Sequence, residues 1–430
     1  MAHIVIVGAG LGGLPMAFEM KEQMRPSDRL TVVSNTPHFH FVPSNPWVAV
    51  GWRQQAEIEL ALAPLLARRG IESTEAGAAR VHAAENRLEL GDGSTLDYDF
   101  LILATGPDLA FDEIEGLGPH DGFTQSVCHV DHAVRAERAW RDFVREPGPV
   151  IVGAVQGASC FGPAYEFARI MDTDLRRRKI RDRVPITFVT SEPYIGHMGL
   201  DGVGDSKGLM ESEFRSHDIK WITSARVTKV AAKTMTIERV DAEGAVSGQE
   251  ELPFSFSMML PAFRGIRAIA GIEGLVNPRG FVIVDKHQRN PAFPNIFAVG
   301  VCVAIAPVGK TPVPVGVPKT GYMIESMVTA TAHNIGRLLR GEDPESEATW
   351  HAICLADFGD KGLAFAAAPQ LAPRNLNWAS GGRWVHWAKI AFEKYFLFKL
   401  KYGLSEPFWE RHILSALGIR RLRNRPGKAA

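Results

Sequence analysis

The pattern of apolar and polar residues predicts a chain that alternates between buried strands and amphipathic helices. The first apolar run, "HIVIVGAG", predicts a strand, and residues 11–24 then carry apolar side chains at helical spacing. "RLTVVSN" predicts a second strand. Residues 86–106 predict a hairpin with its turn at Asp92-Gly93, followed by a buried strand. This alternation is typical of α/β proteins with parallel sheets.

A second alternating unit begins near Gly148. Strands are predicted for "ITFVTS", "VTKVAAKTMTIERV", "GFVIVDKHQRN" and "NIFAVGVCVAI", and a helix for residues 318–339. The aromatic, proline-rich residues 38–52 are too irregular for either regular state. After Trp350 the chain is rich in Trp, Phe, Lys and Arg, and no strand–helix alternation is predicted there.

The composition of the chain argues against several functional classes. The 430 residues suffice for two or three domains, and the formal net charge of zero gives no general attraction to nucleic acid. The four cysteines are far apart and form no CxxC, so we expect neither a disulfide scaffold nor a metal site. The first residues lack the basic segment of a signal peptide, and no apolar run is long enough to span a membrane.

The first strand leads into a dinucleotide-binding fingerprint. Gly8, Gly10 and Gly13 have the spacing G-x-G-x-x-G between a strand and a helix. The first glycine permits a tight turn, the second lets the backbone approach a pyrophosphate, and the third allows the helix to pack on the strand. The acidic residue expected about twenty positions later is replaced by Ser34-Asn35, which can still bind a ribose without a charge.

The second unit has a degraded version of the same fingerprint. After Gly153 the required glycines are replaced by Val155 and Ala158, so NAD(P)H is not expected as electron donor. Cys160 falls in the first turn of the predicted helix, where the helix dipole favours a thiolate. Taken alone, Cys160 also fits a small buried apolar residue. Glu166, six residues further on, is expected on a different helix face and has no predicted catalytic role.

Several further motifs resemble one enzyme family. "YDFLILATG" and "NIFAVG" are similar to the FAD motifs of the flavoprotein disulfide reductases, although Val301 stands where those proteins have an aspartate. "FVPSNPWVAVGW", "GASCFGPAYE", "SEPYIGHMG", "GVGDSKG", "TPVPVGVPKTGYMIES" and "AICLADFGDKG" resemble bacterial sulfide:quinone oxidoreductases. The resemblance extends from the first strand to the C-terminal tail and implies FAD as cofactor. The implied contacts to FAD are Gly8, Ala9, Gly10, Leu11, Gly12, Gly13, Ser34, Asn35, Val42, Pro43, Ala78, Thr105, Gly106, Gly300, Val301 and Lys319.

The resemblance also implies the redox centre. Cys160 and Cys354 match the cysteine pair that forms a disulfide or carries bridging sulfur beside the flavin, and Cys128 matches a third family cysteine. Hydrogen sulfide would be oxidised there to sulfane sulfur or polysulfide. His132 and His197 are candidate proton carriers, although each also fits an ordinary structural histidine. Cys302 matches no motif and is expected to serve packing.

The C-terminal tail predicts where the electrons go. Residues 383–401 form a helical pattern of aromatic residues and lysines, which suits a helix lying in a membrane interface. The alternative is a helix docked on the protein core or on a second copy of the chain. The resemblance implies a quinone at this end, with Phe392 and Trp409 beside its ring and Lys389 at an oxygen. Because no sheet partner is predicted for this segment, a chain ending near Gly382 is expected to keep its flavin.

These expectations give an α/β fold with two Rossmann-like, three-layer domains and a C-terminal region of membrane-binding amphipathic helices. The predicted FAD-binding domain comprises residues 1–120 and 285–345, the second domain 146–284 and the C-terminal region 346–430. The expected activity is that of a peripheral sulfide:quinone oxidoreductase of the cell membrane. The side of the membrane and a homo-oligomeric state are left open. Three alternatives are a type-2 NADH:quinone dehydrogenase, the flavin subunit of a cytochrome-reducing sulfide dehydrogenase, and a flavin-binding redox sensor.

Overall fold

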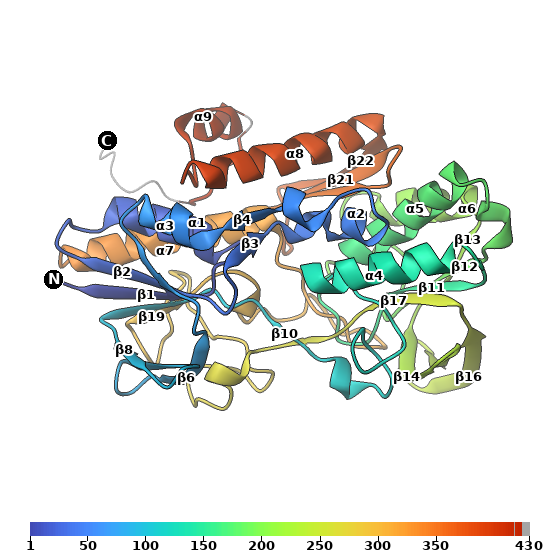
Figure 1. Cartoon of the computed structure of the whole chain (residues 1–430), viewed down its shortest axis with the longest axis horizontal. Helices are drawn as coiled ribbons and strands as arrows, with labels where there is room; N and C mark the ends of the chain where they lie inside the picture. Colours follow the sequence, from blue (N-terminus) through green and yellow to red (C-terminus); the bar gives the residue numbers. More distant parts are fainter. Residues whose placement is uncertain (417, 424–430) are drawn as a thin grey trace.

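The computed structural model describes residues 1–416 and 418–423. Two parallel sheets lie side by side along the long axis of the molecule (Figure 1). The helices α8 (Arg383–Lys401) and α9 (Phe408–Ala416), drawn in red, lie along one side of both units (Figure 1). The predicted α/β architecture is therefore confirmed.

The first parallel sheet has the strand order β19-β9-β1-β2-β5. Its strands are β1 (His3–Val7), β2 (Arg29–Val33), β5 (Glu72–Thr74), β9 (Phe100–Leu103) and β19 (Ile296–Ala298). Ile4 of the central strand pairs with Leu30 on one side and Phe100 on the other. Helices α1 (Gly13–Gln23) and α7 (Gly321–Leu339) pack together on one face of the sheet (Figure 1). Burial of both faces explains why these strands are continuous apolar runs.

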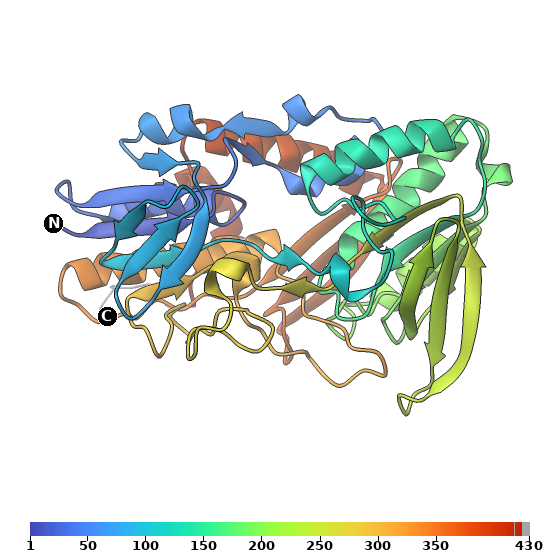
Figure 2. The same cartoon turned by 60° about the horizontal axis from the view of Figure 1, so that its bottom comes forward.

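Small antiparallel sheets cover the other face and the edges of this unit (Figure 2). Their strands are β3 (His38–His40), β4 (Glu59–Ala61), β6 (Ala78–His82), β7 (Arg87–Leu90) and β8 (Thr95–Asp97). A further two-stranded sheet of β10 (Asp108–Leu109) and β18 (Phe263–Arg264) lies between the two units (Figure 1). The hairpin turn at Asp92-Gly93 is confirmed, with a φ of 85° at the glycine. The expectation of an irregular loop at residues 38–52 is wrong in part, since β3 and the short helix α2 (Asn45–Ala49) lie there.

The second parallel sheet has the order β13-β12-β11-β17. Its strands are β11 (Val150–Ala154), β12 (Ile186–Thr190), β13 (Ile219–Ile222) and β17 (Phe256–Leu260), and its helices are α4 (Val130–Phe143), α5 (Gly162–Arg177) and α6 (Ser206–Ser216). An antiparallel meander of β14 (Ala225–Ala231), β15 (Thr234–Val240) and β16 (Val246–Pro253) extends from it. The single strand predicted for residues 227–240 is thus a hairpin, and β16 includes part of the polar stretch after it.

The strand predicted for "GFVIVDKHQRN" is wrong, because this segment forms only isolated bridges. The side chain of Asn277 accepts hydrogen bonds from two backbone N–H groups, and Asp285 accepts two more. Such side-chain bonds hold the backbone in turns and compete with pairing in a sheet.

Short helical turns complete the two units. They are α3 (Leu62–Ala67) and the 3-10 turns Val42–Ser44, Gln55–Glu57, Phe111–Glu113, Arg181–Arg183, Arg267–Ile269 and Gly300–Cys302.

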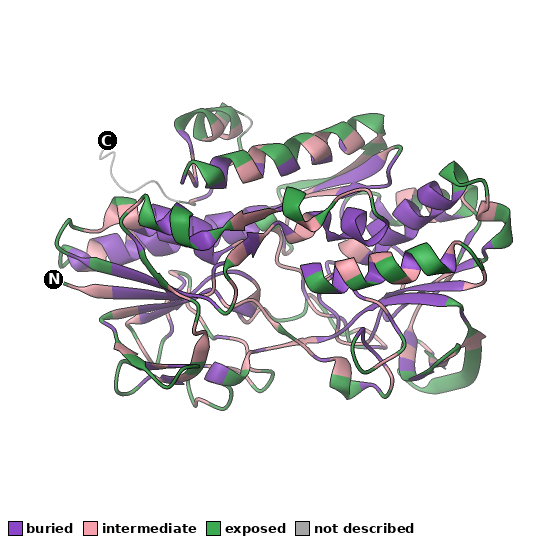
Figure 3. Ribbon diagram, in the orientation of Figure 1, coloured by how far each residue is buried: buried purple, intermediate pink, exposed green. Residues whose placement is uncertain are grey.

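The C-terminal region contains a third, antiparallel sheet. Its strands are β20 (Ala352–Asp357), β21 (Gly362–Ala368) and β22 (Leu376–Gly382), in the order β20-β21-β22. Helix α8 packs on all three strands, so the prediction of a tail without strands is wrong. The helix is buried on this side and exposed on the other (Figure 3). Within the described residues no helix combines the length and hydropathy needed to cross a membrane.

Candidate active site

The first fingerprint forms a cradle at the carboxyl end of β1. A Cβ atom on Gly8 would overlap the Ala104 carbonyl, and one on Gly13 would overlap the Gly8 carbonyl. A Cβ on Gly10 meets no described atom within 4 Å. The first and third glycines are therefore required by packing, whereas Gly10 faces open space beside the start of α1. This is the geometry in which a backbone and a helix N-terminus receive a pyrophosphate.

The other predicted cofactor contacts gather at the same edge of the sheet. Ser34-Asn35 follows β2, Thr105-Gly106 follows β9 and Gly300-Val301 follows β19, all at the carboxyl ends of parallel strands. Ala9, Leu11 and Gly12 belong to the cradle loop, Val42 and Pro43 to a 3-10 turn, and Ala78 to the start of β6. The Ser34 hydroxyl donates to Thr36 O in its own turn, at 2.9 Å, which leaves the exposed Asn35 side chain free for a ribose.

Lys319 lies two residues before α7, which begins at Gly321 rather than at the predicted residue 318. Burial lowers the pKa of Lys319 to about 8, and its Nζ lies 4.8 Å from the Phe281 ring centroid. The adjacent Thr320 hydroxyl is buried and has no hydrogen-bond partner among the described residues. A buried ammonium and an unsatisfied hydroxyl at a helix start fit the polar edge of an FAD ring system.

Cys160 and Cys354 come from different parts of the chain to one place. Cys160 lies in the loop between β11 and α5, Cys354 lies on β20, and Cys128 precedes α4. All are free thiols. Burial raises the pKa of Cys160 to about 12, and the charges of Cys128 and Cys354 raise it further, against the nearby Lys319. The predicted stabilisation of a thiolate by the helix start is wrong, because α5 begins only at Gly162 and burial dominates.

Burial also raises the pKa of Cys128 to about 11 and the pKa of Cys354 above its usual value. Two charges act on Cys354: Lys389 lowers its pKa and Glu166 raises it. Cys302 lies elsewhere, in the core, where its S–H group donates to Leu103 O at 3.2 Å. That environment agrees with the packing role expected for Cys302.

Glu166 is the residue that sequence reasoning missed. It is 5 % exposed on α5, and burial raises its pKa to about 7, against the attraction of Lys389. Lys389 Nζ lies 3.1 Å from Glu166 Oε1, and Asp357 N donates to the same oxygen at 3.2 Å. The charge on Glu166 acts on both Cys160 and Cys354. The signal was a carboxylate within the apolar run "PAYEFARIM", since an unpaired charge is rarely buried.

The two candidate histidines occupy different surroundings. His132 is 5 % exposed in the first turn of α4, and its ring stacks 5.0 Å from the His129 ring. Burial lowers the pKa of His132 to about 4. His197 lies in the loop after β12, where its Nδ1 accepts from Gly199 N at 3.2 Å and its ring contacts Tyr194. Burial also lowers the pKa of His197.

The degraded second fingerprint is closed by the chain itself. Gly157 N donates to Pro314 O at 2.7 Å, and Gly316 N donates to Ala158 O at 2.8 Å. Val155 in the same loop is 1 % exposed. Backbone groups that would face a nicotinamide pyrophosphate are thus engaged by another segment, which supports the expectation that NAD(P)H is not bound here.

The three residues expected at a quinone are not equivalent. Phe392 and Trp409 are 39 % and 38 % exposed, and the Phe392 ring lies 5.9 Å from that of Phe41. Lys389 is only 5 % exposed and points inward to Glu166 and Leu355 O. The structure therefore places the Lys389 ammonium near Cys354 rather than on the outer surface of α8.

Comparison with known proteins agrees with this site. A model of the pyridine nucleotide-disulphide oxidoreductase family matches residues 2–333. The chain is 40% identical over 414 residues to the sulfide-quinone reductase of Aquifex aeolicus, covering 96% of this chain and 94% of that protein. The X-ray structure of the sulfide:quinone oxidoreductase of the same bacterium superposes with a TM-score of 0.93 at 38% identity and full coverage of both chains.

A type II NADH:quinone oxidoreductase of Staphylococcus aureus is only 20% identical over 357 residues, covering 80% of this chain and 84% of that protein. The alternative of an NADH dehydrogenase is thus the more distant relationship. The glycine cradle, the strand-end contacts and the buried Lys319 fit FAD, the cofactor of this family. The chain belongs to the sulfide:quinone oxidoreductases, within the pyridine nucleotide-disulphide oxidoreductase family of flavoproteins.

Proposed function

We propose that this chain oxidises sulfide at Cys160 and Cys354 and transfers the two electrons through FAD to a membrane quinone. The observation that carries the proposal is that the charges of Cys354 and Glu166 both act on Cys160. Lys319, a predicted contact of FAD, acts on the same thiol. A dithiol next to a flavin suits a two-electron sulfur substrate. FAD, when bound in this cradle, would accept an electron pair and release it to the quinone.

In the oxidised enzyme Cys160 and Cys354 would form a disulfide. Hydrosulfide attacks one sulfur, which forms a persulfide on that cysteine and releases the other as a thiolate. The proton of the hydrosulfide needs an acceptor. Glu166, whose pKa is raised to about 7, is half ionised near neutral pH and lies beside both thiols. We therefore assign Glu166 as this acceptor, held in place by Lys389.

Lys319 and Lys389 each supply positive charge to one of the two cysteines. Lys319 acts on Cys160, and Lys389 acts on Cys354. Each favours an anionic sulfur that burial would otherwise disfavour. Cys128, which also lies within charge range of Cys160, is placed to take part in sulfur transfer. His197 stays in the proposal as a proton carrier toward the solvent, whereas burial lowers the pKa of His132 to about 4 and leaves it a poor carrier near neutral pH.

The quinone and the membrane belong to the outer side of α8. Exposed aromatic side chains of α8, α9 and β22 gather there, which suits a helix pair lying in the headgroup region of a bilayer. Phe392 and Trp409 would flank the quinone ring, and the chain would be a peripheral protein of the cell membrane. Lys389 would act through Glu166, because its ammonium points inward.

The deciding experiment compares two reductants without oxygen. Sulfide should bleach the 450 nm band of the bound FAD within the time of one turnover, whereas NADH should leave it unchanged. Added quinone should then restore the band. Bleaching by NADH and not by sulfide would identify an NADH dehydrogenase instead. Reoxidation by a cytochrome and not by quinone would identify the flavin subunit of a sulfide dehydrogenase.

A further inference from the structure

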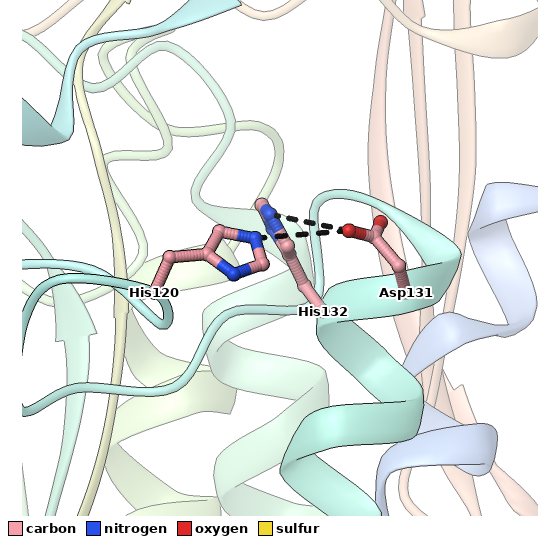
Figure 4. A group of neighbouring side chains, drawn as sticks. All are labelled: His120, Asp131 and His132. Carbon is pink, nitrogen blue, oxygen red and sulfur yellow. Dashed lines mark ion pairs between the residues drawn. The ribbon is translucent and has the colours of Figure 1, made fainter.

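We propose that His120, Asp131 and His132 bind a divalent transition-metal ion of the zinc class. One nitrogen or oxygen of each side chain lies within 4.8 Å of the others. Asp131 Oδ2 lies 3.7 Å from His120 Nε2 and 3.9 Å from His132 Nε2 (Figure 4). Two imidazole nitrogens and one carboxylate oxygen thus converge on one point, although the cysteine pattern of the sequence predicts no metal site.

The three residues come from two segments that the fold brings together. Asp131 and His132 lie in the first turn of α4, whereas His120 lies in the preceding loop (Figure 4). The His120 and His132 rings are 5.1 Å apart at an angle of 65°. Phe111 packs against His132 from another direction, at 5.8 Å. The position of the His132 ring is therefore fixed by packing on several sides.

The state of His132 suits a metal ligand. The side chain is 5 % exposed, and its Nε2 is the ring nitrogen that faces Asp131 Oδ2, at 3.9 Å. A buried imidazole whose ring is held by packing is a suitable ligand for a metal ion.

The donor set selects the metal. Imidazole with a single carboxylate suits Zn²⁺ and the neighbouring ions Co²⁺ and Ni²⁺, whereas Mg²⁺ and Ca²⁺ prefer oxygen alone. In a tetrahedral zinc site the ligand atoms lie about 3.3 Å apart. The distances of 3.7 and 3.9 Å to Asp131 Oδ2 must shorten by a few tenths of an ångström, and the separation of the two imidazole nitrogens, which is within 4.8 Å, must shorten by up to about 1.5 Å. His120 and Asp131 are exposed and able to move. Three protein ligands leave a fourth position for water.

A simpler explanation accounts for only one of the three residues. An aspartate in the first turn of a helix stabilises the helix dipole, and this alone explains Asp131. It does not explain two imidazole nitrogens that both lie within 4 Å of the same carboxylate oxygen. Arg135, one turn further along α4, is the one cation other than histidine among the charges that act on His132, and it opposes the metal. An ion at this site would link the loop that contains His120 to the first turn of α4. Asp131, one of its ligands, lies three residues after Cys128 in the sequence.

The test uses the full-length FAD-containing protein, freed of metal with EDTA and assayed without sulfide. Zn²⁺ is titrated by calorimetry, and the zinc-loaded protein is examined by X-ray absorption. We expect about one equivalent bound through nitrogen and oxygen ligands with imidazole scattering and no sulfur. His120→Ala should weaken binding at least about 10-fold, since even indirect partners of a metal contribute that much. Asp131→Asn should act in the same direction.

His82→Ala is the matched control, because His82 is a half-buried histidine that lies 3.6 Å from Glu85 and 3.2 Å from Glu89 and is outside the proposed ligand cluster. Its affinity for Zn²⁺ should equal that of the unmodified protein. Equal affinity in His120→Ala, or sulfur in the zinc coordination shell, would overturn the proposal and assign the zinc to the cysteines. Neither readout depends on turnover, so failure here leaves the proposed oxidation of sulfide untouched.

Discussion

Lys389 Nζ lies 3.1 Å from Glu166 Oε1 in a site from which water is almost excluded. Burial raises the pKa of Glu166 to about 7, while Lys389 opposes the rise. A carboxyl group with such a pKa exchanges protons readily at neutral pH. Because the pair lies between α5 and α8, it connects the proposed redox cysteines to the helix that carries the candidate membrane surface.

Replacing Glu166 by Gln should remove the proton acceptor. As the pH rises through about 7, Glu166 loses its proton and becomes a base, so the rate of FAD reduction by sulfide should rise over that interval. In Glu166→Gln the rate at pH 8 should fall by about 10²-fold, and the part of the rise that is due to Glu166 should disappear. Stopped-flow bleaching of FAD across the pH range measures both effects, with the unmodified protein correcting for the titration of hydrogen sulfide itself.

The control for this variant is Glu393→Gln. Glu393 is also a buried carboxylate of an ion pair, with Arg53 Nε at 3.1 Å and the Ser44 hydroxyl at 2.6 Å. Its loss should also destabilise the fold, since each variant removes a buried carboxylate from an ion pair. It should leave the pH profile unchanged. The same profile in Glu166→Gln and in the unmodified protein would show that the proton goes elsewhere.

The cysteine pair provides a second prediction. Cys160→Ser and Cys354→Ser should each abolish reduction of FAD by sulfide, because a serine cannot form the disulfide that hydrosulfide attacks. FAD should stay bound in both variants. Cys302→Ser should retain activity, since Cys302 lies in the core with its S–H group bonded to backbone. Near-normal bleaching in Cys354→Ser would contradict the assigned redox centre.

The glycine cradle separates cofactor binding from folding. In Gly10→Val the new side chain meets no described atom near its Cβ, so the protein should fold but lose FAD and its yellow colour. In Gly13→Ala the new methyl group would overlap the Gly8 carbonyl, so the fold itself should be destabilised. Absorbance at 450 nm and thermal unfolding distinguish the two. A yellow, active Gly10→Val protein would show that the pyrophosphate lies elsewhere.

These sites differ in how far the sequence alone predicts them. Gly8, Gly10 and Gly13 lie close together in the chain, and the backbone conformation that they require is local. Their spacing alone was therefore sufficient to predict the cradle. Glu166 and Lys389 are separated by 223 residues, and only the folded chain shows that they form a pair. The pKa of Cys160 was predicted to shift downward, and the structure raises it, for the same reason. The helix dipole can be inferred locally, but the burial that outweighs it comes from distant segments.

The end of the chain shows the same limit. The sequence showed an amphipathic helix at residues 383–401, and α8 is confirmed. The sheet on which α8 packs could not be predicted, because β20–β22 show little of the alternation of apolar and polar residues that is typical of strands. The prediction that a chain ending near Gly382 keeps its flavin must be withdrawn. Without α8, the buried Glu166 and Glu325 would lose the ammonium groups of Lys389 and Lys399, and the protein should unfold.

The membrane surface is therefore better tested by substitutions on the outer side of α8 and α9. Trp387, Phe398 and Phe408 are 66 %, 49 % and 70 % exposed. Exchange of all three for Gln removes little from the core, so the fold and the bound FAD should be retained. Each aromatic residue contributes about 1.5 kcal/mol or more when buried in lipid, so loss of all three should weaken binding to vesicles by about 10³-fold or more.

Two measurements on this triple variant separate the anchor from the chemistry. Sulfide should bleach its FAD at the normal rate, because the cysteines and Glu166 are unchanged. Reoxidation by a quinone embedded in vesicles should slow, whereas reoxidation by a short-chain, water-soluble quinone should not, because Phe392 and Trp409 remain in place. Phe123→Gln is the matched control, since Phe123 is 48 % exposed in a loop away from α8 and α9. Vesicle binding as strong as that of this control would place the membrane surface on another face of the molecule.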